Sequence, residues 1–199
     1  MTPSIETRIR AIIGALEHLV VPALAEADSI VQEQAGLALA HLKIIEQQLP
    51  FVDTYHTICL AEQLRLGRKL LACAAGGVAT MAAVAALAAA VDAATARLGH
   101  DAAAREDRHA VAGASSQLVI ASSRDGTPAF ITASQEVLIA HGLRQSARDR
   151  AWYGPTGLDP FGAGLPSIPE MVTAERAEDI HELNFFTVDR MQPQRAAAE

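Results

Sequence analysis

The chain has 199 residues and a formal net charge of −7, and half of its residues are hydrophobic while only 4% are aromatic. This length suffices to bury a continuous core, and the acidic balance excludes the basic surface that a nucleic-acid partner requires. Much of the apolar content is alanine, the best intrinsic helix former, so we expect an all-α fold.

Apolar residues recur at helical spacing along most of the chain and predict a bundle of five to six helices. Thr127-Pro128 is typical of a helix start, and Ser29 with Gln32 is a candidate capping box. The expected helices cover residues 3–20, 29–49, 51–74, the Ala-rich stretch up to about residue 98, 101–125 and 128–153.

Residues 70–98 form an Ala-rich stretch in which Asp92 and Arg97 are the only charges. We expect it to be the central, buried helix of the bundle, because small residues let neighbouring backbones approach closely. About twenty uncharged residues also reach the length of a membrane span. Ala and Gly contribute little transfer free energy, however, so a membrane location is the less favoured interpretation.

The stretch 154–169 carries four glycines and four prolines, which exclude a helix. Apolar residues continue through it, so we expect an ordered, extended arm. Ser167 with Glu170 has the spacing of a capping box and predicts a short final helix. The sequence therefore predicts a helical bundle domain over 1–153 and an arm over 154–199, packed on the bundle or on a partner subunit.

The two cysteines, Cys59 and Cys73, fall in one helical region roughly 20 Å apart and cannot pair within it. The N-terminal residues lack the pattern of a secretory signal, and we expect a reduced, cytoplasmic protein. All basic residues are arginines except Lys43 and Lys69. This bias is typical of a GC-rich genome, and we expect a bacterial source.

A metal hypothesis rests on two Glu-x-x-His pairs, Glu106 with His109 and Glu178 with His181. On a helix this spacing puts a carboxylate and an imidazole one turn apart on one face. Two such pairs, with a Glu from each of two other helices, form a di-iron or di-manganese site, and Glu62 is a candidate for one of these. Both pairs lie in charged segments, which favours the alternative that they are solvated helix ends.

His41 and His141 each lie among apolar residues at helical spacing. A buried imidazole needs a hydrogen-bond partner, and pairing with Glu62 would satisfy both groups. The sequence therefore predicts His41, Glu62 and His141 as buried polar residues that serve catalysis or ligation, with satisfied core histidines as the alternative. His18 and His56 lie beside polar residues, and we expect both to be exposed.

The few aromatic residues suggest a groove for an apolar small molecule or a protein partner, because aromatic side chains dominate interface energetics. Its predicted lining is Tyr55, Trp152, Tyr153 and Phe161. The chain has no Walker loop, no Gly-x-Ser-x-Gly elbow and no Cys-x-x-Cys, which disfavours the familiar nucleotide and acyl-transfer enzymes. We expect a helical binding or accessory module that acts as a homodimer without a cofactor. The alternative is a bundle-type oxidoreductase or hydrolase that depends on iron or manganese.

Overall fold

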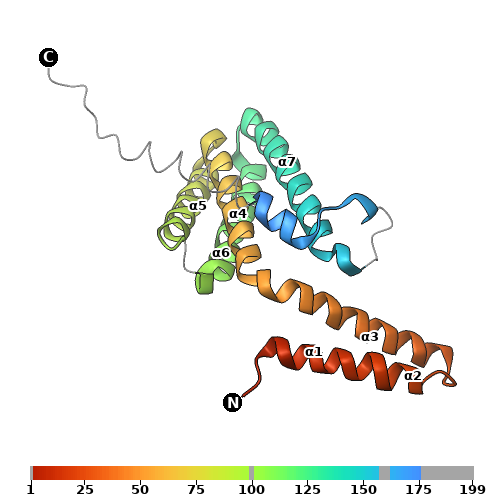
Figure 1. The fold of residues 1–199 in the computed structure, drawn as a ribbon. Coiled ribbons are helices and arrows are strands. Elements are labelled where there is room, and N and C mark those ends of the chain that lie inside the picture. Colours follow the sequence, from red (N-terminus) through yellow and green to blue (C-terminus); the bar gives the residue numbers. More distant parts are fainter. Residues whose placement is uncertain (1, 99–100, 157–161, 176–199) are drawn as a thin grey trace. The chain divides into compact units, whose positions relative to one another are not determined.

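The computed structural model describes residues 2–98, 101–156 and 162–175, and this part of the chain is all-α, as predicted (Figure 1). Six of its helices have eleven residues or more. In chain order the elements are α1 (Ile5–Ala15), a π turn η1 (Leu16–Val20), α2 (Val21–Ala23), α3 (Ser29–Gln48), η2 (Leu49–Phe51), α4 (Val52–Cys73), α5 (Val78–Ala96), α6 (Asp101–Asp125), α7 (Pro128–Tyr153), and the 3-10 turns η3 (Gly154–Thr156) and η4 (Gly162–Gly164).

The chain divides into two compact units. The first, which we call the hairpin unit, is Met1–Val52 with Ala147–Met171; the second, the four-helix unit, is built on Asp53–Ser146. One boundary between the two units therefore falls inside α7. Within the hairpin unit, Gln48 at the end of α3 donates from Nε2 to the carbonyl oxygen of Trp152 at 2.9 Å, which joins the end of α7 to α3.

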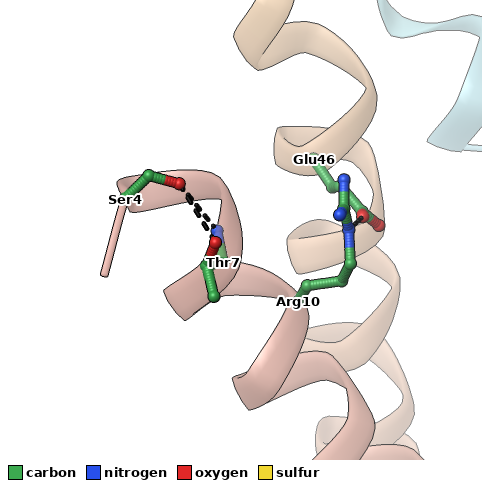
Figure 2. Close-up of polar contacts among 4 residues, drawn as sticks. All are labelled: Ser4, Thr7, Arg10 and Glu46. Atoms are coloured by element: carbon green, nitrogen blue, oxygen red, sulfur yellow. Dashed lines mark hydrogen bonds and ion pairs between the residues drawn. The ribbon is translucent and has the colours of Figure 1, made fainter. Parts of the chain in front are cut away.

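The hairpin unit contains the antiparallel helices α1 and α3, which run side by side (Figure 1). Arg10 on α1 pairs with Glu46 on α3 at 2.8 Å (Figure 2), and Lys43 on α3 pairs with Glu17 at 2.8 Å. Ser4 precedes α1, and its hydroxyl accepts a backbone N–H three residues further on. The ion pairs are exposed and therefore contribute little stability, but they fix which sides of the two helices meet.

Two of the predicted helix starts are confirmed. Phe130 N donates to Thr127 Oγ1 at 3.2 Å at the start of α7. Ser167 and Glu170 form a reciprocal capping box, with Ser167 N and Oγ donating to Glu170 Oε2 at 2.9 and 2.7 Å and Glu170 N donating to Ser167 Oγ at 3.4 Å. Residues 168–175 are helical, as this cap predicts.

The predicted capping box at the start of α3 is wrong. Asp28 is the N-cap residue, and its side chain makes no capping hydrogen bond. Gln32 instead donates from Nε2 to the carbonyl oxygens of Ala25 and Ala27, at 3.0 and 2.9 Å. Its side chain therefore binds the preceding turn, where free carbonyls are available after α2 ends.

The core of the four-helix unit is organised around α4, which has eleven buried residues. Leucines on successive turns of α4 meet apolar side chains from α5, α6 and α7 in one cluster. The largest members with at most 1% exposure are Leu64, Leu70, Leu87, Val111, Leu118 and Phe130.

The Ala-rich helix α5 is not the buried centre that the sequence predicts. Only Thr80, Leu87, Val91 and Ala94 are buried in it. Of its most apolar 18-residue stretch, 22% is buried inside the protein. An alanine helix carries apolar residues on all sides, so composition does not tell which side is covered, and the larger leucines of α4 take the centre. By length and composition alone, α5 is also the one helix in the described residues that could cross a membrane, which is weak evidence for a span.

The connection between α4 and α5 is bound to the connection between α6 and α7. Gly77 N donates to Asp125 O at 2.8 Å, and Thr127 N donates to Ala75 O at 3.0 Å. The Asp125 carboxylate also caps α5, because Oδ1 accepts from Thr80 N at 2.9 Å and from Thr80 Oγ1 at 2.6 Å. These hydrogen bonds hold the pKa of the Asp125 carboxyl below its usual value, and the bond from the Thr80 hydroxyl has the largest effect.

Candidate functional site

A buried ion cluster joins α4 to α7 in the four-helix unit. Glu62 on α4 is 1% exposed, and its Oε2 lies 3.2 Å from Arg144 Nε and 3.6 Å from His141 Nδ1, both on α7. Its other oxygen, Oε1, pairs with Nη1 of Arg65 on α4. We call Glu62, Arg65, His141 and Arg144 the Glu62 cluster.

Helical spacing explains why each helix supplies two members. Arg65 follows Glu62 by three residues, and Arg144 follows His141 by three, so each pair lies on one face of its helix. The two faces meet because leucines on α4 pack into the same core as Phe130 on α7. The cluster is thus a polar contact inserted into an otherwise apolar helix interface.

The charges of the cluster favour a closed ion network over a reactive carboxylate. Arginine stays protonated in proteins, so the two guanidinium groups outnumber the single carboxylate among the four members. A carboxylate that already faces two guanidinium groups and an imidazole has little capacity left to bind a metal or to accept a proton from a substrate. The side chain of Arg144 is 37% exposed, and the cluster therefore reaches solvent through this residue.

The structure brings together two of the three predicted buried polar residues. His141 is buried and lies beside Glu62, as expected from the sequence. His41 is exposed, and the prediction that it is buried is wrong. It lies on α3, where Ile44 is the only buried residue, so apolar neighbours at helical spacing do not imply burial there. A catalytic or ligating role for Glu62 and His141 stays a prediction.

The candidate metal ligands do not gather in the part of the chain that the structure describes. Glu106 and His109 are exposed on α6, and Glu62 is engaged by arginines. Glu178 and His181 lie outside the described residues. Over residues 2–98, 101–156 and 162–175, no three His, Cys, Asp or Glu side chains are placed to hold a metal ion.

The residues predicted to line the aromatic groove belong to both units. Tyr55 belongs to the four-helix unit, and Trp152 and Tyr153 belong to the hairpin unit. Tyr55 and Trp152 are buried, whereas Tyr153 is 56% exposed. Phe161 lies outside the described residues, so the groove stays a prediction.

Sequence reasoning missed the two arginines of the Glu62 cluster. Their signal is present in the spacing, because Arg65 and Arg144 each follow a predicted buried polar residue by one helical turn. It also misplaced His56, which is half-buried on α4. Burial first, and then the nearby charges of Arg108 and Arg105, lower the pKa of this imidazole.

No protein-family model, curated protein or solved structure matches this chain.

Proposed function

We propose that this protein is a helical-bundle binding or accessory module that acts as a homodimer in a reducing, cytoplasmic compartment. The supporting observation is the exposure of large apolar side chains on the hairpin unit. Ile5 is 61% exposed, Ile12 49%, Ile30 65% and Ile45 44%. Apolar side chains exposed on a protein surface mark interaction sites where they adjoin one another, and these residues therefore support a binding role.

The buried polar groups of the four-helix unit support the same interpretation. Glu62 is engaged by Arg65 and Arg144, and the buried Asp107 is paired with Arg97. Such groups stabilise and position the helices through contacts with one another. Binding through apolar surface accounts for the exposed residues without assigning a reaction to these closed networks.

Mass in solution and metal content test this function against the metal-dependent alternative. The untagged protein is purified without chelator, its mass is measured by light scattering over a range of concentrations, and its metals are quantified by elemental analysis. The proposal predicts twice the 21.0 kDa mass of one chain and no stoichiometric metal. A monomer at all concentrations overturns the homodimer, and two equivalents of iron or manganese per chain favour the alternative enzyme.

A further inference from the structure

We infer that the exposed apolar face of the hairpin unit is covered by the same face of a second copy of this chain, so that two hairpins form a four-helix bundle with two-fold symmetry. The inference rests on the proposed function and names the surface through which the homodimer forms.

Both helices of the hairpin carry an apolar stripe with a seven-residue spacing. On α1, Ile5 and Ile12 are 61% and 49% exposed. On α3, Val31 and Ile45 are 42% and 44% exposed, with the exposed Ala38 midway between them. A spacing of seven residues keeps side chains on one face of a helix, as in the contact seam of a coiled coil.

The two stripes lie on the same side of the hairpin. At about 100° per residue, Ile12 lies about 160° around α1 from Arg10, and Ile45 lies about 160° around α3 from Lys43. The ion pairs made by Arg10 and Lys43 join the two helices along one side (Figure 2 shows the first). Both ion pairs are exposed and therefore lie along one edge of the hairpin. We place the two apolar stripes along its other edge, where they form one face, which we call the hairpin face.

The π turn after α1 keeps the hairpin face continuous. A π turn takes up one more residue than an α-helical turn. Within η1 (Leu16–Val20), the position that continues the stripe of Ile5 and Ile12 is therefore Val20 and not Leu19. Val20 is 41% exposed. The hairpin face thus consists of Ile5, Ile12, Val20, Val31, Ala38 and Ile45, none of which is charged.

The size of the hairpin face fits a second copy. The 20 residues of α3 span about 30 Å, and two packed helices are on the order of 20 Å wide. The whole side of the hairpin that carries this face therefore covers roughly 600 Å² before side-chain relief is counted. A stable dimer buries about 800 Å² per partner. A two-fold interface requires a surface that complements itself, and this uncharged face meets the requirement because it sets no like charges against each other. The net charge of −7 disfavours an anionic membrane surface as the occupant.

The test compares the full-length protein with charge substitutions on and off the hairpin face. Ile12→Glu and Ile45→Glu each place a carboxylate in the proposed interface, and Ala40→Glu places one on an exposed position of α3 outside the face. Light scattering across a dilution series gives the dissociation constant, and circular dichroism verifies that each variant retains its helix content. We expect both face variants to weaken the dimer by roughly 100-fold or more and Ala40→Glu to leave it unchanged.

The outcomes separate this inference from the proposed function. A dimeric wild type whose Ile12→Glu and Ile45→Glu variants remain folded and dimeric overturns the hairpin face and leaves the homodimer standing. A monomeric wild type overturns both. A monomer that floats with phosphatidylglycerol vesicles, and stops doing so on Ile12→Glu, assigns the face to a membrane and likewise overturns the inference. If a glutamate variant loses helix content, Ile12→Ser and Ile45→Ser replace the pair with the same expected direction.

Discussion

Arg144 on α7 and Glu62 on α4 are 82 positions apart in the sequence, and Arg144 Nε donates to Glu62 Oε2 at 3.2 Å. The carboxylate is almost fully enclosed, whereas the arginine side chain is 37% exposed. A buried ion pair gains little net stability over a well-packed apolar pair, but removing one partner leaves the other charge uncompensated. The loss of stability on removing one member of the Glu62 cluster therefore measures how strongly the packing of α4 on α7 depends on it.

Glu62→Gln should destabilise the fold strongly, because it removes the only carboxylate of the cluster and leaves Arg65 and Arg144 facing each other's charge. We expect the free energy of unfolding to fall by about 3 kcal/mol or more, measured by urea denaturation. Glu136→Gln, at an exposed position of α7, is the matched control. A loss as small as that of the control would show that the cluster contributes nothing to the joining of α4 and α7.

Gly67 is expected to be intolerant of any side chain. A Cβ built there lies 2.8 Å from Val91 Cγ2 of α5 and 3.4 Å from Val111 Cγ1 of α6. Gly67→Ala should therefore cost about 1–3 kcal/mol through overpacking. Gly113→Ala is the control, since nothing lies within 4 Å of its added Cβ and alanine favours helix by about 1 kcal/mol. Thermal denaturation should shift the two variants in opposite directions, and a shift in the same direction would contradict the close approach of α4 to α5.

The Asp125 cap should make the four-helix unit sensitive to acid. Because the folded-state pKa lies below the ordinary value of 3.8, the unfolded chain binds the proton more readily. The stabilisation is therefore complete above that value and is lost as the pH falls through the folded-state pKa. Thr80→Val removes the hydroxyl that contributes most to the shift.

Urea denaturation of the wild type and Thr80→Val, at about pH 5 and about pH 2.5, measures this linkage. We expect Thr80→Val to be less stable than the wild type at the higher pH and the difference to shrink at the lower pH. Thr132→Val, exposed on α7, is the control substitution. A difference that is independent of pH would mean that the hydrogen bond to Asp125 does not depend on its charge.

The imidazole of His56 should titrate below its usual value of 6.5, because burial and two nearby arginines disfavour its protonated form. Arg108→Gln removes the larger of the two charge effects and should raise the pKa of His56. Arg124→Gln, near the other end of α6, should leave it unchanged. Nuclear magnetic resonance titration of the imidazole measures the pKa of His56 in both variants. An equal change of this pKa in both would show that Arg108 does not act on His56.

Periodicity predicted the helices well because each is defined by local spacing and punctuated by Gly or Pro. The short cap at Ser167 and Glu170 was predictable for the same reason, since both partners lie within one turn. The contact of His141 with Glu62 could be expected because an acid and a histidine placed among apolar residues must find polar partners. That rule does not say which partners, and so the arginines were missed.

Burial was the property that the sequence predicted least reliably. His41 has apolar neighbours, yet it lies on a hairpin that buries only Ile13 in α1 and Ile44 in α3. The Ala-rich α5 has no side that differs from the others, so its sequence could not show that α4 would take the centre. In both cases burial depends on what packs against a helix, which is a tertiary property.

Hydrogen bonds join the α4–α5 connection to the α6–α7 connection. The helices α5 and α6 therefore form a segment of the chain whose two ends are bonded to each other. The backbone leaves at Ala75 and returns at Thr127, one hydrogen bond away. The end of α4 and the start of α7 are therefore neighbours by backbone contact, and Glu62 joins the same two helices again farther along each of them. The register of α4 against α7 is thus held at this end by backbone hydrogen bonds between the two connections, and these bonds involve neither the middle of α5 nor the middle of α6.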